Sequence, residues 1–275
     1  MLLLLSALAA AATFLARTNA VLIHRNGLIA QAQAGADAAI LEAISRLSDE
    51  NAARHPSIGT SSFAFEHIPV VVQMSIEDGR IDLNTADRDL ILAFLQSQGV
   101  SQDAASTMLE DLRFWQGAIH DKSVQGNGLE SPPAEGTAAP QLLEMLQSAD
   151  EVRRIPSWSA RPLDCWLEYF TVYTHLPSVS IQYAPAQVLA ALRWAQDHHL
   201  DNRDWVFDSQ FPSSATTQSM IGEVVRISAT ATLANELSAT SEWVGRLTGE
   251  SRRPFLTLRW THSKLAPKVC SSPVE

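Results

Sequence analysis

The stretch from Leu2 to Leu47 most constrains the fold, because it contains no proline and keeps a helical pattern. Residues 1–16 read MLLLLSALAAAATFLA and carry no charged side chain. Beyond Arg17 the apolar residues recur at helical spacing, at Val21, Leu22, Leu28, Ile29, Ala32, Ala36, Ala39, Ile40, Ala43, Ile44 and Leu47. This spacing predicts one helix with a broad apolar face. At about 1.5 Å per residue, the helix exceeds the roughly 30 Å diameter of a small domain, so part of it must extend beyond.

The apolar beginning of this helix fits three interpretations. A cleaved signal peptide needs a basic n-region and a small-residue cleavage site. Thr18–Asn19–Ala20 is a poor site, and no basic residue precedes Leu2. A complete membrane span needs about 20 apolar residues, whereas residues 2–16 cover only about 22 Å of a ~30 Å core. The third interpretation is a membrane helix whose beginning lies upstream of Met1. Its alternative is an uncleaved signal anchor on an unrelated periplasmic protein.

The segment 76–95, IEDGRIDLNTADRDLILAFL, predicts a turn, a short strand and a helix. Glu77–Gly79 suits the turn, because aspartate bonds its own backbone there and glycine accepts positive φ. In the strand over 80–83, apolar and polar residues alternate, which places Asp82 on the solvent side. The β-rich segment 63–76 is expected to pair with this strand across the turn.

Helices follow this strand. Asn84 or Thr85 offers a side-chain oxygen to cap a helix over 87–98, and Gly99 ends it. Ser101 caps the next helix, which runs to about Trp115.

The remaining elements follow from local patterns. Ser148 and Glu151 match a capping box that opens a short helix, and Pro156 stops it. Residues 163–175 are rich in aromatic residues and permit either a helix or a strand. A second, weaker strand-to-helix unit is expected at 179–198. The other segments are a helix at 141–146 and strands at 224–233, 242–248 and 255–260.

These patterns occur in an order that resembles the K-type minor pseudopilin of bacterial type II secretion (general secretion pathway protein K). That family carries an I-N-L-N-x-A…L…L segment, an E-L…I-P-G segment and an N-x-N-T-A…V-L-A-A-L segment. The matching segments here are GRIDLNTADRDLILAFL (79–95), ADEVRRIP (149–156) and VSIQYAPAQVLAAL (179–192). The resemblance covers nearly the whole chain, and the order and spacing of the motifs carry it.

The resemblance implies an α+β pseudopilin fold, in which a long N-terminal helix packs on an antiparallel sheet and a large helical domain is inserted. The expected parts are a membrane and stalk helix (1–50) and the first part of the sheet (51–84). The next expected parts are the inserted helical domain (85–178) and a strand-helix unit with the C-terminal part of the sheet (179–275). The family's basic leader, which a prepilin peptidase removes, is expected upstream of Met1 or is already cut off.

The resemblance also implies a function. A K-type subunit lies at the tip of the type II secretion pseudopilus and supports its assembly and the export of folded proteins from the periplasm. The implied partners are the I-type and J-type minor pseudopilins, the other pseudopilins, and the lipid bilayer around the N-terminal helix. The implied location is the bacterial inner membrane, with a single N-terminal span and a periplasmic body.

Two rival functions belong to other classes. One is a membrane-anchored periplasmic protein that binds a small ligand or polysaccharide through the aromatic residues 163–173. The other is an acidic hydrolase with two carboxylates about 5–10 Å apart. No H-E-x-x-H, C-x-x-C, glycine-rich phosphate loop or G-x-S-x-G motif is present. The net charge of −10 argues against nucleic acid, which requires basic patches. The sequence predicts a protein that is not an enzyme.

Calcium is the cofactor that the resemblance implies. Family members often carry an acidic D-W-x-D-x-D run after the second insert helix. This chain has RFWQGAIHD (113–121) there, so Trp115 is present, but residues 116–119 hold no carboxylate and only Asp121 follows nearby. Carboxylates at turns are the ligands that Ca²⁺ prefers. The calcium candidates are therefore Asp201, Asp204 and Asp208, which form either an ion-binding loop or a solvated acidic turn.

Two further groups of residues were considered as sites. His198 and His199 with Asp201 come nearest to a metal cluster, but adjacent residues on a helix do not share a face. Cys165 and Cys270 are the only cysteines. They form either one disulfide bridge or two separate thiols.

Overall fold

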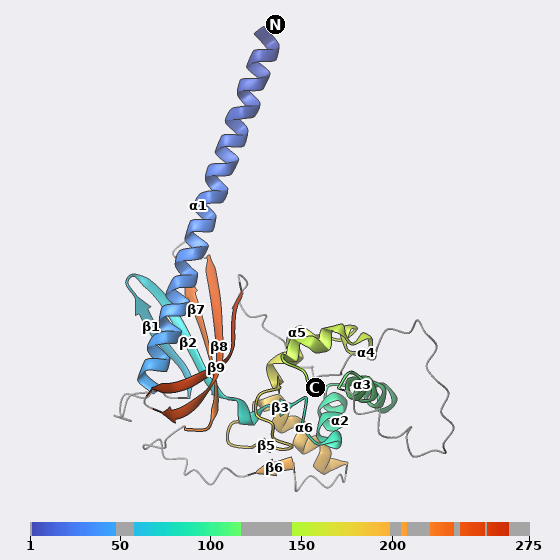
Figure 1. Ribbon diagram of the computed structural model, residues 1–275. Coiled ribbons are helices and arrows are strands. Elements are labelled where there is room, and N and C mark those ends of the chain that lie inside the picture. Colours follow the sequence, from blue (N-terminus) through green and yellow to red (C-terminus); the bar gives the residue numbers. More distant parts are fainter. Residues whose placement is uncertain are drawn as a thin grey trace, which may run out of the picture. The chain divides into compact units, whose positions relative to one another are not determined.

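The computed structural model describes residues 2–47, 58–116, 145–198, 205–207, 221–233, 237–250 and 252–263. The chain divides into two compact units (Figure 1). The first contains residues 1–75 and 212–267, and the second contains residues 76–211 and 268–275. The domain boundaries expected from the sequence stay a prediction.

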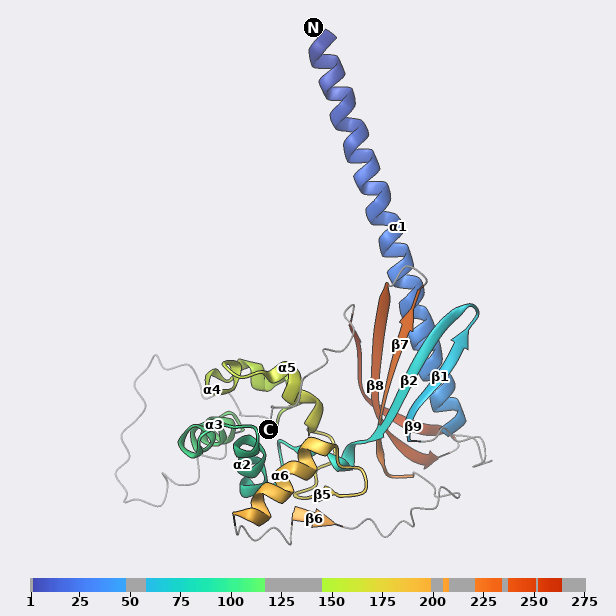
Figure 2. The ribbon, with the colours of Figure 1, turned by 180° about the vertical axis from the view of Figure 1, so that it is seen from behind.

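The first unit combines one long helix with a five-stranded sheet, which confirms the α+β class (Figures 1 and 2). The helix α1 runs over Leu2–Leu47 without a break. The strands are β1 (Gly59–Phe65), β2 (Ile68–Ile76), β7 (Val224–Thr232), β8 (Ser238–Glu250) and β9 (Arg253–Ser263). Their order is β1-β2-β7-β8-β9, with β1–β2, β7–β8 and β8–β9 antiparallel. Early and late strands thus share one sheet, as expected, and the early strand β2 lies beside the late strand β7.

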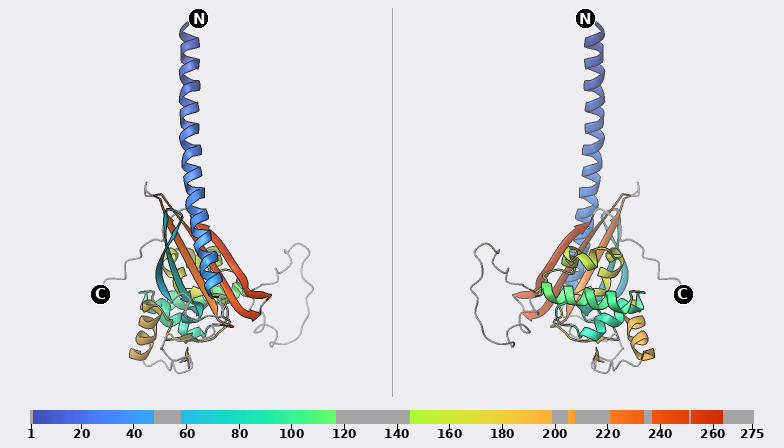
Figure 3. Two further views of the ribbon diagram at one scale, coloured as in Figure 1. Left: turned by 90° about the vertical axis from the view of Figure 1, so that its left-hand side faces the viewer. Right: turned by 90° about the vertical axis from the view of Figure 1, so that its right-hand side faces the viewer.

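The last part of α1 packs on one face of this sheet, chiefly on β7 and β8 (Figure 3). Successive side chains of β7 point to opposite faces of the sheet, so every second residue, each apolar, faces the helix. The buried residues on the sheet side are Val225, Ile227, Ala229, Ala231, Ala239 and Trp243, and those on the helix are Ala32, Ala36, Ala39, Ile40, Ala43, Ile44 and Leu47. The alanines give a thin layer that lets the helix axis approach the sheet, while the isoleucines supply most of the buried apolar area.

The second unit is mainly helical, with two short parallel ladders. Its main helices are α2 (Arg88–Ser97), α3 (Gln102–Trp115) and α6 (Ala186–Asp197). The shorter helical segments are η3 (Ala149–Arg154), α4 (Pro156–Ser159), α5 (Leu163–Trp166) and η4 (Leu167–Tyr169), with η2 (Glu77–Gly79) ahead of them. The ladders pair β3 (Ile81–Asp82) with β4 (Phe170–Thr171), and β5 (Val179–Ser180) with β6 (Val206–Phe207).

Aromatic side chains fill the core of the second unit. The ring centroids of Phe94 and Phe170 lie 4.8 Å apart, and those of Trp158 and Phe170 lie 5.8 Å apart, both close to edge-to-face. The buried indole N–H of Trp158 donates to the Met108 carbonyl at 2.8 Å, so its polar atom is satisfied. The segment 163–175, which permits a helix or a strand on sequence grounds, is α5, η4 and β4 in turn.

A buried ion pair lies at the start of the second unit. The Glu77 carboxylate has no solvent exposure and pairs with the Arg80 guanidinium at 2.8 Å. Arg80 Nε also donates to the Glu168 carbonyl at 2.7 Å, which ties η2 to η4. Burial of the phenol raises the pKa of Tyr169 above its ordinary value. A hydrogen bond with Glu168 and the negative charge of Glu168 add smaller increases.

A buried carboxylate, Asp82, holds the connection between β3 and α2. Its side chain is 1% exposed. Oδ1 accepts from the backbone N–H groups of Asn84 (2.8 Å) and Thr85 (3.2 Å). Oδ2 accepts from the N–H and hydroxyl of Thr174 (3.1 Å each) and the N–H of His175 (2.9 Å). The carboxylate therefore joins two segments that are ninety residues apart in sequence.

The structure corrects several local predictions. Residues 77–79 form a 3₁₀ helix rather than a hairpin turn, and β3 pairs with β4 rather than with the segment 63–76. Asp82 is buried, not on the solvent side. The side-chain cap of α2 is Asp87, whose Oδ1 accepts from the Asp89 N–H at 2.8 Å.

Other predictions near the helix ends have mixed outcomes. Gly99 follows α2 with φ +82°, which confirms it as the residue that ends the helix. Ser101 is the N-cap residue of α3, but its side chain makes no capping bond. The short helix after Ser148 is η3, which ends at Arg154 ahead of Pro156 as predicted. Pro156 also begins α4, because its fixed φ suits the first helical position. Of the helix expected over 141–146, residues 141–144 lie outside the described residues, and 145–146 are not helical.

Cys165 is disulfide-bonded, whereas Cys270 lies outside the described residues. Since the chain has only these two cysteines, we expect a Cys165–Cys270 bridge. Peptide mapping without reductant is expected to yield one cross-linked peptide that contains both, and reduction should separate it. Replacing both by serine should lower the free energy of unfolding by about 2–5 kcal/mol. Two free thiols in the unreduced, folded protein would contradict this prediction.

Candidate assembly surface on the long helix

The helix α1 changes from solvent-exposed to packed near Leu28. Among its described side chains, residues 11–27 are all exposed, and burial begins with Leu28 and Ile29. Four large apolar side chains on the exposed part are more than 60% exposed, namely Phe14 (71%), Leu15 (61%), Val21 (66%) and Ile23 (72%). The sequence pattern alone places Val21 and Leu22 on the same apolar face as Ile40 and Ile44. The structure shows that only the later residues of that face contact the sheet.

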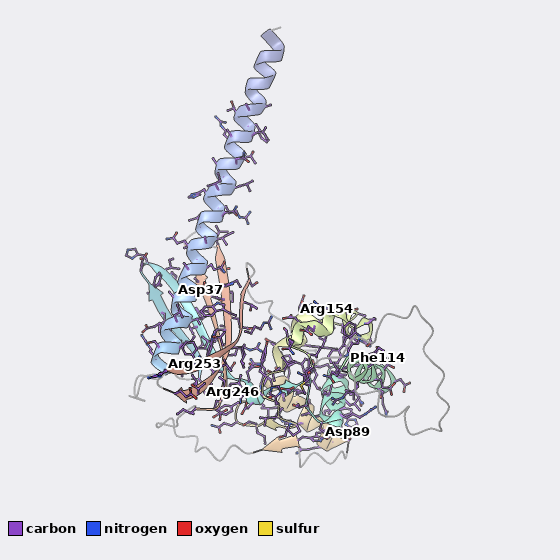
Figure 4. All side chains as sticks on the ribbon, viewed as in Figure 1. Asp37, Asp89, Phe114, Arg154, Arg246 and Arg253 are labelled. Atoms are coloured by element: carbon purple, nitrogen blue, oxygen red, sulfur yellow. The ribbon has the colours of Figure 1, made fainter. Side chains whose placement is uncertain are left out.

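The packed part of α1 is held by polar contacts as well as by its alanines and isoleucines. Asp37 Oδ1 lies 3.2 Å from His262 Nε2 on β9 (Figure 4 labels Asp37). Near the end of the helix, Arg46 pairs with Glu42 at 2.8 Å, and its guanidinium lies 4.9 Å above the ring of Phe63. The Arg46 side chain thus brings the end of the helix into contact with β1.

The exposed part of α1 is suited to binding other apolar surfaces. A side chain the size of Val or Phe gains about 1.5–3 kcal/mol when it is fully buried, so an uncovered row of them favours association. The charged residues up to Asp37 are all basic, Arg17 and Arg25, with His24 beside them. Thr18 keeps its hydroxyl within the helix by donating to the Phe14 carbonyl at 3.0 Å. A partner that packs here must offer apolar side chains and tolerate this basic segment.

Among the described helices, none combines the length and the apolar character needed to cross a bilayer.

The metal candidates from the sequence are not tested by the structure. Asp201, Asp204 and Asp208 lie outside the described residues. Within the described part of the chain, no group of three or more His, Cys, Asp or Glu side chains is placed to hold a metal ion. His199 is also outside the described residues, and His198 stacks on Trp194 with ring centroids 3.9 Å apart.

The aromatic segment that a polysaccharide-binding protein would use is part of the core. Trp166, Tyr169 and Phe170 are all buried. Phe94 contacts each of their rings, with centroid distances from 4.8 to 6.3 Å. Buried rings cannot stack on a sugar, so this segment gives no support to the rival function.

Sequence reasoning missed two polar side chains that the structure brings to the β3–α2 connection. Arg113 and Gln116, at the end of α3, donate hydrogen bonds to oxygen atoms of residues 83–86. Gln116 lies four residues after the buried Leu112 and seven after the buried Leu109, so a polar residue on the apolar side of α3 is the one local signal. Nothing local indicates the contacts of Arg113.

Comparison with known proteins gives a structural match only. No protein-family model matches the chain, and no curated protein matches it. The structure is similar to a chain in the crystal structure of the GspK-GspI-GspJ complex from the enterotoxigenic Escherichia coli type 2 secretion system. The two are 15% identical with a TM-score of 0.51, and the match covers 90% of this chain and all of the other. At this identity the match establishes the fold, and the chain has a pseudopilin-like fold.

Proposed function

We propose that this chain is a K-type minor pseudopilin of a type II secretion system. The observation that carries the proposal is α1, which is packed on a sheet at its end and exposed along the residues before it. Such a helix is incomplete alone and needs other helices to cover Phe14, Val21 and Ile23. The pseudopilin-like fold and the motif order of the sequence agree with this proposal.

The proposed partners are I-type and J-type minor pseudopilins, together with other pseudopilins of the same filament. The matched crystal structure is itself a complex of three such proteins by its name, GspK, GspI and GspJ. The tip position rests on the second unit, a compact body built from residues 76–211 between β2 and β7. In the family that the sequence resembles, the bulk of this insert prevents a further subunit from stacking above.

The proposal places the first residues of α1 in the inner membrane and the two compact units in the periplasm. It is supported by the uncharged sequence of residues 1–16 and by the exposure of the apolar residues that follow. The work of the protein is then binding, with no bond made or broken, and the pseudopilus that it starts helps folded proteins to leave the periplasm.

The experiment is co-purification of the full chain with candidate I-type and J-type pseudopilins in detergent. We expect a complex that holds one copy of this chain. The double variant Val21→Asp with Ile23→Asp should weaken the complex about tenfold or more, because two apolar contacts are replaced by charges that resist burial. Asn26→Asp is the control for added negative charge, since it introduces one aspartate at an exposed polar position of the same helix.

Two results would contradict the proposal. The first is a chain that stays monomeric with every candidate partner while its folded units remain intact. The second is a complex that the double variant and the Asn26→Asp control form equally well, because α1 would then not carry the interface.

A further inference from the structure

Two side chains at the end of α3 bind four oxygen atoms of the β3–α2 connection. Arg113 donates from Nη1 to the Asn84 carbonyl at 3.4 Å and from Nη2 to the Ala86 carbonyl at 3.1 Å. Gln116 Nε2 donates to the Leu83 carbonyl at 2.7 Å and to Asn84 Oδ1 at 3.2 Å. Arg113 Nη1 also donates to Gln116 Oε1 at 3.2 Å, which joins the two donors.

Asn84 extends this cluster to a third segment. Its Nδ2 donates to the Leu146 carbonyl at 2.9 Å, and its Oδ1 accepts from the Leu146 N–H at 3.0 Å. Asn84 is 9% exposed and Leu146 is 5% exposed. The cluster therefore fastens Leu146 to the β3–α2 connection, beside the end of α3.

Several oxygen atoms within reach of one another create a negative potential that requires a positive group. A hard cation such as Ca²⁺ neutralises such a potential by binding about six to eight oxygen ligands. A guanidinium neutralises it with five N–H donors and a permanent positive charge. Burial and the charge of Arg88 lower the pKa of Arg113, and Asp87 opposes them. An arginine remains cationic at neutral pH under such influences, so the cluster already contains its positive charge.

We propose that Arg113 and Gln116 form a built-in cationic clasp, in which a guanidinium and an amide take the place of a bound divalent ion at Asn84. Calcium, which the sequence resemblance implies after the second helix of this unit, does not fit at this position. The four oxygen atoms are already occupied by N–H donors, and the guanidinium would repel a second cation. The inference is independent of the proposed function.

Hydrogen exchange with mass spectrometry on the full chain in detergent tests the clasp, read at peptides that contain residues 83–86 and 145–146. Exchange is compared in a buffer with about 1 mM Ca²⁺ and in a buffer with about 5 mM EDTA. We expect the wild type to protect these peptides equally in both buffers. Arg113→Ala should raise their exchange about tenfold or more in both buffers, because it leaves buried carbonyl groups without donors. Arg154→Ala, an exposed arginine on η3 (Figure 4), is the matched control.

Arg113→Lys separates charge from geometry. Lysine keeps the charge but lacks the planar fork, so it should restore only part of the protection. Faster exchange of these peptides in the wild type after chelation would overturn the proposal, because the cluster would then require a metal ion. Equal exchange in Arg113→Ala and Arg154→Ala would also overturn it. If Arg113→Ala does not fold, the comparison of wild type in the two buffers and the lysine variant still decide the question.

Discussion

Replacing Asp82 by alanine is expected to unfold the second unit. The carboxylate accepts five hydrogen bonds from Asn84, Thr85, Thr174 and His175. Its removal leaves several buried N–H groups without an acceptor, and each costs about 1–3 kcal/mol. The total loss in free energy of unfolding is on the order of 4 kcal/mol or more. Denaturation followed by tryptophan fluorescence measures it, because buried Trp158 lies in this unit.

Two variants sharpen this experiment. Asp82→Asn keeps the size but turns an N–H group toward other N–H groups, so it should recover only part of the loss. Asp103→Ala removes an exposed carboxylate from the first turn of α3 and should cost less than about 1 kcal/mol. If Asp82→Ala were as stable as Asp103→Ala, the carboxylate would not hold the β3–α2 connection to residues 174–175.

Gly79→Ala is expected to have an effect of similar size for a steric reason. A Cβ atom at Gly79 would lie 2.6 Å from the Ala184 nitrogen and closer still to the Tyr183 carbonyl. These are backbone atoms, so no side-chain rotation relieves the overlap. The turn at 183–184 must move away from η2, at a cost of about 3 kcal/mol or more, beyond ordinary overpacking. Thermal unfolding of the purified variant gives the loss.

Gly27→Ala is the matched control for this substitution. A Cβ atom at Gly27 meets nothing within 4 Å. Because Gly27 lies within α1, alanine there should stabilise the helix by about 0.5–1 kcal/mol. A Gly79→Ala protein that unfolds at the wild-type temperature would show that the close approach between η2 and the 183–184 turn is not required.

The late strands of the first unit's sheet were predictable because their signals are local. In β7 the alternation of Val225 and Ile227 with Arg226 reports which face is buried, and no distant contact changes it. The long helix was predictable for the same reason. The sequence does not show how much of the apolar face of this helix is covered, because that depends on where the sheet lies. In the structure, burial begins only near Leu28.

The β3–α2 connection was not predictable, because its polar side chains serve distant segments. Asn84 and Thr85 have the right chemistry to cap α2. However, Asn84 bonds to Leu146, and the Thr85 hydroxyl donates to the Leu176 carbonyl at 3.0 Å. The side chain that caps α2 is therefore Asp87. The alternation of apolar and polar residues predicts that Asp82 faces solvent. Asp82 is buried instead, because Thr174 and His175 donate hydrogen bonds to its carboxylate.

The candidate assembly surface could be located from sequence as an apolar stretch, but its extent required the structure. The calcium candidates Asp201, Asp204 and Asp208 stay a prediction. The clasp was beyond sequence reasoning, because nothing in RFWQ (113–116) indicates that Arg113 reaches the carbonyl groups of residues 84 and 86.

The adjacency of β2 and β7 has a consequence for how this protein can change over evolutionary time. The chain leaves the sheet after Ile76 and returns at Val224 on the neighbouring strand. For the sheet, everything between these residues is a loop, and doubling a loop's length costs only about 0.6 kcal/mol in closure entropy. Residues can therefore be gained or lost in the second unit with little penalty to the pairing of β2 with β7. A lineage can remodel the second unit while it retains the helix and sheet of the first unit.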